Sequence, residues 1–356
     1  MNVLTISDTI SVNGLGNVSS RLALGFTNYG HSSTMISLYN EASMTDEFLC
    51  CVNVVSLHIN RKDCRRKVLK IISNKISGLI QSNGKKFDLI LVHGQSTTKI
   101  LKNYKHTAIY FYVHNTLSLD LTNNYSFLKG AIKKIKARIL YKNLNLICVS
   151  EGVKHDVLKV MNIQPKSIQV IYNGLDKELI LAKSKMNNIN KNENYIINIS
   201  RFVPEKRHDI LIKAFIKSEI DCKLILVGEG FEKQKYENII KDLGLQDQII
   251  FMGHLENPYP VLSGARYLVH TADFEGFGLV LLEALILDIP VIARNCPSGP
   301  NEILTGALQD SLIAMDDFDG LVQCMIKQSS EKKEDMSAYT KKFLLENIVP
   351  EYEKLI

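Results

Sequence analysis

The chain has 356 residues, of which 46% are apolar and 22% charged, and this length and composition predict a globular protein of two domains. No apolar run reaches the roughly 20 residues that cross a bilayer, and the N-terminus lacks the basic and apolar segments of a secretory signal. The seven cysteines are scattered without a CxxC pair, which argues against a disulfide framework or a zinc site and is typical of a cytoplasmic protein.

Charge is divided unevenly along the chain. Residues 1–180 contain 23 Lys and Arg against 11 Asp and Glu, a net charge of +12, whereas residues 181–356 have a net charge of −6. Such an asymmetry indicates two domains with different partners, of which the first binds something anionic.

The first half alternates strand-like apolar runs with helical patterns. A short strand opens the chain, and a glycine-bearing loop and a helix follow it. Further strand-like runs lie at residues 34–38, 52–57, 87–93, 107–114, 144–150 and 168–174. Alternation of this kind requires crossover connections and a parallel sheet covered by helices on both faces. We therefore predict a doubly wound, Rossmann-like α/β domain over residues 1–180.

A polar stretch rich in Asn and Lys interrupts this alternation at residues 181–194, and it is predicted to be an interdomain linker. The alternation then resumes and predicts a second Rossmann-like domain over residues 195–340. Residues 341–356 have an amphipathic pattern interrupted by Pro350, and we expect this C-terminal helix to pack back toward the first domain.

Two doubly wound domains that face each other across a cleft bind ligands outside the carboxyl ends of their strands. The polar residues predicted at those ends are therefore the first candidates for a site. They are His93, His114, Asn173, Arg201, Glu229, His254 and the loop around Glu275.

The segment EGFGLVLLE, residues 275–283, places Glu283 in an apolar helix. A buried carboxylate without a partner is costly, so Glu283 needs one. A pair of ligand hydroxyls would satisfy it, and so would an ion pair with a neighbouring Arg or Lys such as Arg294. Gly276 and Gly278 precede the same helix, where unpaired N–H groups attract phosphate, although an ordinary turn uses the same glycines.

Arg201 and Lys206 lie five residues apart in a loop that follows a predicted strand. Two cations at the carboxyl end of a strand can hold a diphosphate, with Arg bidentate and Lys as a point charge. The alternative is a solvated charge cluster with Glu205 and Arg207. No group of His, Cys, Asp and Glu has the spacing of metal ligands, so we expect neither a metal nor a cofactor.

A second glycine turn contains Gly14 and Gly16 and joins strand to helix near the start of the chain. It lacks the third glycine of a dinucleotide fingerprint, but it could approach a phosphate or a sugar. His93 and His114 each end an apolar strand, where either could bind a sugar or a phosphate. For His93 we favour a structural role.

Two basic stretches, residues 61–80 and 129–143, have helical periodicity. One face of the second carries four apolar residues: Ile132, Ile135, Ile139 and Leu140. A basic amphipathic helix can lie on an anionic membrane surface, and a core-packed helix with a solvated outer face has the same pattern.

Five segments carry a family resemblance when they are taken in order. They are NGLGN with the helix after it, VSEGVKHDVLK with IQVIYNGLD, ISRFVPEKRHDILIKAF, EGFGLVLLEALILDIPVIA and CPSGPNEIL. Together they resemble the retaining glycosyltransferase family 4, of the two-domain GT-B fold, in its bacterial surface-polysaccharide type. Two residues depart from the pattern: Asp288 stands where glycine is usual, and Arg207 where glycine or asparagine is frequent.

The resemblance implies roles for individual residues. Arg201 and Lys206 match residues that hold the donor diphosphate, and Glu283 matches the glutamate that binds the ribose hydroxyls. Glu275 and His114 match residues near the donor sugar, so the expected catalytic set is Glu275, His114, Arg201 and Lys206. Further donor contacts are matched by Gly14, Gly16, Phe277, Gly278 and Leu279.

The activity that the resemblance implies is transfer of a hexose or an N-acetylhexosamine from a nucleotide sugar, with a UDP-sugar favoured, to a saccharide acceptor. Protein cations would stabilise the leaving diphosphate without a metal, and front-face attack assisted by that phosphate is expected, because no glycosidase-like carboxylate pair can be assigned.

The expected acceptor is lipid-linked and binds the basic first domain at the inner face of the cytoplasmic membrane. The process would be lipopolysaccharide O-antigen, capsule or exopolysaccharide biosynthesis, with no nucleic-acid partner. The alternatives are a GDP-mannose-dependent mannosyltransferase of the same family, a nucleotide-sugar epimerase of the same architecture, and a binding protein without enzymatic activity.

Overall fold

The computed structural model describes residues 1–10, 15–39, 46–59, 66–82, 86–123, 127–186, 194–329 and 336–356. The chain divides into two compact units, the first made of Met1–Asp176 and Phe343–Ile356 and the second of Lys177–Lys342. The division therefore falls after Asp176, whereas the sequence placed the end of the first domain at residue 180. Helix α8 (Lys177–Ser184) extends into the stretch expected to be a linker.

The first unit is built on a seven-stranded sheet in which every neighbouring pair is parallel, in the order β3-β2-β1-β4-β5-β6-β7. Its strands are β1 (Asn2–Ser7), β2 (Ser32–Ser37), β3 (Asn53–Ser56), β4 (Leu89–His93), β5 (Ile109–Val113), β6 (Asn145–Cys148) and β7 (Ser167–Val170). The central strands β4 and β5 are buried along their whole length, as expected for apolar runs between two helical layers.

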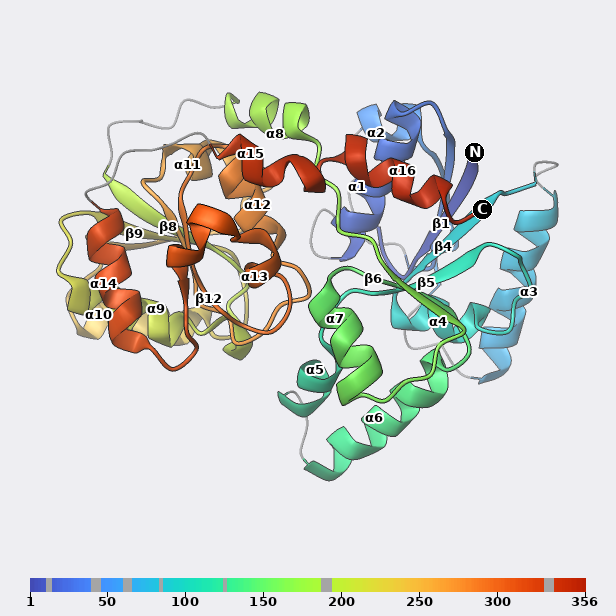
Figure 1. Ribbon diagram of the computed structural model, residues 1–356, viewed down its shortest axis with the longest axis horizontal. Coiled ribbons are helices and arrows are strands. Elements are labelled where there is room, and N and C mark those ends of the chain that lie inside the picture. The colour runs from blue at the N-terminus through green and yellow to red at the C-terminus, as the bar shows by residue number, and fades with distance from the viewer. Residues whose placement is uncertain are drawn as a thin grey trace. The chain divides into compact units, whose positions relative to one another are not determined.

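Helices cover both faces of this sheet (Figure 1). On one face lie α1 (Leu15–Asn28) and α16 (Leu345–Glu353), and on the other α3 (Arg66–Ser82) and α4 (Gln95–Leu101). The other helices of the unit are α2 (Asp46–Cys51), α5 (Leu117–Asn123), α6 (Phe127–Tyr141), α7 (Glu151–His155) and the π-helix η2 (Asp156–Val160).

The C-terminal helix α16 packs on the first unit. The buried hydroxyl of Tyr352 contacts the hydroxyl of Tyr112 on β5. Leu345 packs closely against Gly25 and Gly174, because a Cβ on either glycine would come within 3 Å of the Leu345 side chain. Small residues on the first unit thus make room for the returning chain.

Helix α16 continues through Pro350, so the expected interruption at this residue is wrong. Proline has no N–H to donate to the carbonyl four residues earlier, which weakens a helix. Here Ile348, Val349 and Tyr352 around it are buried, and tertiary packing offsets the lost hydrogen bond.

The second unit contains a six-stranded sheet in the order β10-β9-β8-β11-β12-β13, again with only parallel pairs among the described strands. Its strands are β8 (Tyr195–Ile199), β9 (Lys223–Val227), β10 (Ile249–Gly253), β11 (Leu268–His270), β12 (Val291–Arg294) and β13 (Leu312–Ile313). A core of aliphatic and aromatic side chains from β8, β9, β11 and the helices on one face holds the unit together.

The helices of the second unit also form two layers (Figure 1). One contains α9 (His208–Ser218), α10 (Lys233–Asp242) and α14 (Phe318–Gln328), and the other contains α8, α11 (Tyr259–Gly264) and α12 (Leu279–Ile286). Shorter pieces are η3 (Pro204–Lys206), α13 (Pro300–Ile303), η4 (Gly306–Ser311), α15 (Ser337–Thr340) and η5 (Lys341–Phe343).

Both sheets have the reversal of strand order that defines a doubly wound fold. The reversal lies between β1 and β4 in the first unit and between β8 and β11 in the second. These features confirm the predicted class, two α/β domains with parallel sheets. No helix within the described ranges is long and apolar enough to cross a bilayer.

Candidate functional site

The candidate site lies where the strand order of the second sheet reverses. Strands β8 and β11 are paired there, and the loops after them carry Lys206 and Glu275. In doubly wound sheets the loops after two such strands diverge, and ligands bind at this point. The structure thus brings together two residues that the sequence selected separately, although they are 69 positions apart.

A cluster of Lys206, Glu275 and His270, called here the Lys206 cluster, forms the centre of this site. The ammonium of Lys206 and Nε2 of His270 both contact Oε1 of Glu275, the imidazole nitrogen at 2.8 Å. Burial alone would raise the pKa of Glu275. The charge of Lys206 and the hydrogen bonds from His270 and Lys206 outweigh burial and hold this pKa well below its ordinary value. The carboxylate is therefore ionised at neutral pH.

The tautomer of His270 follows from this contact. An ionised carboxylate only accepts hydrogen bonds, so Nε2 carries the hydrogen. Nδ1 of His270 is buried and has no hydrogen-bond partner among the described residues. The ring is therefore fixed by Glu275 at one nitrogen alone.

Lys206 is positioned by the turn that carries it. Its backbone N–H donates to the carbonyl of Val203 at 3.0 Å, and the hydroxyl of Thr271 donates to the Lys206 carbonyl at 3.0 Å. The next residue, Arg207, has a φ of 51°, in the left-handed region that favours glycine. Glycine or asparagine is frequent at the position of Arg207 in the family that the sequence resembles. The positive φ explains this preference, because these two residues adopt it most readily.

Ion pairs hold Arg207 in that conformation. Its guanidinium binds Asp209 at 2.9 and 3.0 Å and Asp273 at 3.2 Å, and hydrogen bonding to Arg207 is the main cause that lowers the pKa of Asp209. Arg294 donates to the same oxygen of Asp273, Oδ1, at 2.9 Å, and it donates to the carbonyl of Thr271 at 3.0 Å. The network ties the loops after β8, β11 and β12 together.

This network excludes Arg294 as the partner of Glu283. Arg294 was the named candidate for an ion pair with Glu283, but its guanidinium binds Asp273 instead. Glu283 accepts a hydrogen bond from the hydroxyl of Tyr259 at 3.0 Å. It is also half-buried rather than buried, because Leu279, Val280 and Glu283 form the partly exposed face of α12.

Arg201 differs from Lys206 in its surroundings. Its side chain is 72% exposed and its ion pair with Glu205 is long, at 3.8 Å. The structure therefore does not join Arg201 to the Lys206 cluster. An exposed guanidinium can bind an anion without first being released from a strong partner.

The N-terminus of α12 lies in the loop after Glu275. Gly278 precedes the helix with a φ of 91°, which an L-residue rarely adopts. Phe277 is buried, and its carbonyl packs on Gly299, where a Cβ would lie only 1.9 Å from that oxygen. Leu279 begins the helix and is half-exposed. The first turn of α12 has backbone N–H groups without helical partners, and it begins shortly after Glu275 in the sequence.

In the first unit, His93 and His114 form a pair. Nδ1 of His93 lies 3.0 Å from Nε2 of His114, and both rings stack on Tyr112. Burial lowers the pKa of His114 to about 3, and burial followed by the neighbouring His114 lowers that of His93. Both imidazoles are therefore neutral at pH 7. His114 is half-buried, whereas His93 is fully buried, as its structural role predicts.

The glycine loop is described only in part. Gly14 lies outside the described residues, and Gly16 is the second residue of α1. Glu229, another residue predicted at a strand end, forms an ion pair with Lys233 at 2.7 Å.

Sequence reasoning missed two acidic or basic residues at strand ends. His270 ends an apolar strand just as His93 and His114 do, and that pattern was sufficient to find it. Asp8 directly follows β1 and accepts hydrogen bonds from the backbone N–H groups of Ser96 and Thr97 at 3.0 and 2.7 Å. Asp8 therefore caps the first turn of α4.

Within the part of the chain that the structure describes, no group of three or more His, Cys, Asp or Glu side chains could hold a metal ion. The positively charged side chains of the candidate site are Lys206, Arg201 and the two arginines that bind Asp273, Arg207 and Arg294.

Comparison with known families identifies the class to which this fold and site belong. The model of Glycosyltransferase Family 4 matches residues 12–179, and the model of Glycosyl transferases group 1 matches residues 180–343. The two matches are consecutive and together span nearly the whole chain. The chain belongs to glycosyltransferase family 4.

Characterised relatives are similar to the chain over part of its length and at low sequence identity. The chain is 28% identical over 204 residues to the N-acetylgalactosamine-N,N'-diacetylbacillosaminyl-diphospho-undecaprenol 4-alpha-N-acetylgalactosaminyltransferase of Campylobacter jejuni, covering 57% of this chain and 55% of that protein. It is 26% identical over 242 residues to the lipopolysaccharide 1,6-galactosyltransferase of Salmonella typhimurium, covering 66% of this chain and 63% of that protein. The matched part thus spans between about half and two thirds of these relatives.

Solved structures resemble the chain over its full length. Anabaena HepE in complex with UDP and glucose has a TM-score of 0.77 at 18% identity, covering 99% of this chain and 98% of that one. The lipopolysaccharide outer core galactosyltransferase WaaB has a TM-score of 0.70 at 19% identity, covering 100% and 99%. At such identities the likeness shows the fold, and the fold is GT-B.

The Lys206 cluster makes a prediction about stability and pH. In the native chain the pKa of Glu275 lies below its unfolded value of 4.5, so this carboxylate adds stability above pH 4.5 and loses it as the pH falls. In Lys206→Met the charge that opposes burial most strongly is lost, so we expect burial to raise this pKa above its unfolded value and the carboxyl to take up a proton between pH 7 and pH 5. We expect the variant to be less stable by about 3 kcal/mol at pH 7, and the difference from the native chain to shrink at pH 5.

Chemical denaturation at the two pH values measures this difference. Lys217→Met is the matched control, because it removes a lysine from the exposed pair with Asp319. The control should change the free energy of unfolding by less than about 1 kcal/mol at either pH. An equal loss at pH 7 and pH 5 in Lys206→Met would show that Lys206 does not set the ionisation of Glu275.

Proposed function

We propose that the chain is a retaining glycosyltransferase that moves a hexose or an N-acetylhexosamine from a UDP-sugar to a saccharide acceptor. The observation that carries the proposal is the Lys206 cluster, an ionised carboxylate with a lysine and a histidine, at the reversal of strand order between β8 and β11. Doubly wound domains bind nucleotides at this position.

The leaving group of such a reaction is a nucleoside diphosphate, whose negative charge grows as the bond to the sugar breaks. Lys206 and the exposed Arg201 supply positive charge on the loop after β8. The first turn of α12, which begins after Gly278, supplies backbone N–H groups and the positive end of a helix dipole. Charges held in place before the reaction stabilise the departing phosphate without reorganisation.

Glu283 is the proposed ligand of the ribose hydroxyls. Its half-buried position on the partly exposed face of α12 allows contact with a ligand. A carboxylate accepts several hydrogen bonds at once, so Tyr259 can hold the side chain while hydroxyls of the ribose bind it.

Glu275 is the proposed group beside the transferred sugar. In the proposed step the acceptor hydroxyl oxygen bonds to the anomeric carbon on the face that the diphosphate leaves. The bond to the phosphate oxygen breaks, and the acceptor proton passes to that oxygen, so the anomeric configuration is retained. The ionised Glu275 can orient the sugar through its hydroxyls, and His270 keeps the carboxylate in place. In the first unit, we propose that the neutral His114 contacts the donor sugar.

The choice of donor and acceptor is supported by the relatives. HepE of Anabaena binds UDP and glucose. The Campylobacter relative acts on a sugar linked to diphospho-undecaprenol, and the Salmonella relative acts on lipopolysaccharide. We therefore propose a lipid-linked saccharide acceptor and a role in lipopolysaccharide O-antigen, capsule or exopolysaccharide biosynthesis. GDP-mannose is the second candidate donor.

A thermal-shift panel of nucleotide sugars tests the proposal. A ligand that binds only the folded state at 100 times its dissociation constant stabilises it by about 2.7 kcal/mol, so the donor should raise the melting temperature by several degrees. A UDP-sugar should do so for the native chain and fail with Lys206→Ala, whereas the control Lys217→Ala should keep the shift. No shift with any nucleotide sugar, or conversion of the free donor without an acceptor, would contradict the proposal.

Substitution of Glu283 and of Glu275 should affect different steps, the first mainly donor binding and the second mainly turnover. Glu283→Ala removes the charged group that accepts hydrogen bonds from the ribose hydroxyls, so we expect donor affinity to fall by about 10- to 100-fold with a smaller change in turnover. Glu275→Ala should lower turnover by about 100-fold or more and affect donor affinity less. Titration calorimetry with UDP and steady-state kinetics separate the two effects, and equal losses of both kinds in both variants would refute this division of roles.

A further inference from the structure

Helix α6 carries an exposed apolar stripe that the proposed donor site does not use. Leu128, Ile132, Ile135 and Ile139 are 74%, 52%, 53% and 62% exposed. Their spacing is i, i+4, i+7 and i+11, which places all four on one side of the helix. Large aliphatic side chains scattered singly over a surface are ordinary, but four in a continuous row mark an interaction surface.

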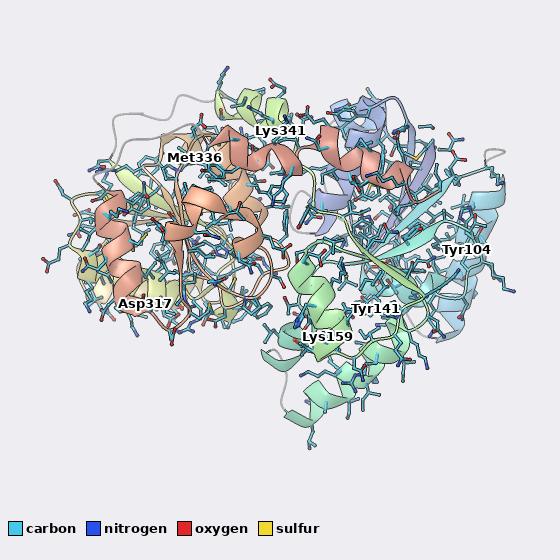
Figure 2. The ribbon with its side chains drawn as sticks, viewed as in Figure 1. Tyr104, Tyr141, Lys159, Asp317, Met336 and Lys341 are labelled. Carbon is cyan, nitrogen blue, oxygen red and sulfur yellow. The ribbon has the colours of Figure 1, made fainter. Side chains whose placement is uncertain are left out.

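The opposite side of α6 packs on the first unit and fixes the orientation of the stripe. Ala137, Leu140 and Tyr141 are buried, and Tyr141 points from the end of α6 into the unit (Figure 2). Gly130 allows close approach of α5, since a Cβ there would lie 2.9 Å from the carbonyl of Leu121. The sequence had placed Leu140 in the apolar stripe, and this was wrong because Leu140 belongs to the buried side.

Basic side chains frame the stripe. Helix α6 has five Lys and Arg residues and no acidic residue. Lys129 and Lys136 are exposed and border the stripe on one side, and neither forms an ion pair with a described residue. Arg138 borders it on the other side and donates to the carbonyl of Met161 at 2.6 Å, which joins α6 to the end of η2. Lys159 on η2 is also exposed (Figure 2).

We propose that α6 is a docking helix for an anionic lipid bilayer, with Leu128, Ile132, Ile135 and Ile139 buried at the boundary of headgroups and acyl chains. An apolar row bordered by lysines matches an interface that is apolar on one side and negatively charged on the other. A second copy of the chain fits less well, because self-pairing through this face would bring two strongly basic helices together. In Figure 1, α6 lies at the lower edge of its unit, next to α5 and α7. The exposed fractions of the four side chains show that neither helix covers the stripe.

The binding of the full chain to vesicles tests this proposal and requires no substrate, so its outcome is independent of glycosyl transfer. We expect the chain to sediment with vesicles that contain phosphatidylglycerol and to bind neutral phosphatidylcholine vesicles at least tenfold less, with the binding weakened by salt. Ile132→Ser with Ile135→Ser should lower binding to anionic vesicles by about tenfold or more. Lys129→Glu with Lys136→Glu should do the same.

Matched controls carry the same changes on the second unit. Ile239→Ser with Leu243→Ser removes two exposed apolar side chains at i, i+4 spacing on α10 and after it, and Lys213→Glu with Lys241→Glu makes the same change of net charge. Both controls should bind vesicles within twofold of the native chain. Circular dichroism should show equal folding for all variants.

Three outcomes would overturn the proposal. The first is equal sedimentation with neutral and anionic vesicles, or with neither. The second is unchanged binding in the two α6 variants, or an equal loss in the controls. The third is a change of oligomeric state in the Ile132 and Ile135 variant, measured by light scattering, without a change in vesicle binding, since this would assign the stripe to contacts between copies of the chain.

Discussion

The candidate site depends on one interaction, the placement of an ionised carboxylate between a lysine and a histidine. Burial by itself would neutralise Glu275, and only the charge of Lys206 and the hydrogen bonds from His270 and Lys206 keep it ionised. In the proposed function, this charge binds sugar hydroxyls and the lysine beside it binds phosphate. The same contact joins the loop after β8 to the loop after β11, so the chemistry of the site and the local fold depend on the same atoms.

The surrounding residues serve to keep that contact in place. Thr271 binds the carbonyls of the turn that carries Lys206, and Arg207 and Arg294 share Asp273 below it. The register of the sheet explains why Arg294 also donates to the carbonyl of Thr271. His270 pairs with Ala293 across β11 and β12, so the residues after them, Thr271 and Arg294, lie side by side. An Arg207 at positive φ is tolerated because two carboxylates bind its guanidinium.

Periodicity predicted the alternation of strands and helices, and the family resemblance predicted the GT-B fold. The alternation is a local signal and the resemblance is a family-level signal. The structure and the comparisons confirm both predictions. What could not be predicted was pairing between distant residues. Glu283 had two candidate partners because sequence spacing does not reveal that Arg294 faces Asp273. The assignment of residues 181–184 to a linker was wrong because these residues, Leu181 to Ser184, continue helix α8, and the Asn- and Lys-rich residues after them gave the whole stretch its linker-like composition. In α6, periodicity identified an apolar face, and only the packing on α5 showed which of its residues are exposed.

The position of UDP in a crystal of the chain tests the proposed donor site most directly. We expect phosphate oxygens within hydrogen-bond distance of Nζ of Lys206, and ribose hydroxyls that donate to the carboxylate of Glu283. UDP bound away from the reversal between β8 and β11, or bound there with Lys206 more than about 6 Å from either phosphate, would contradict it.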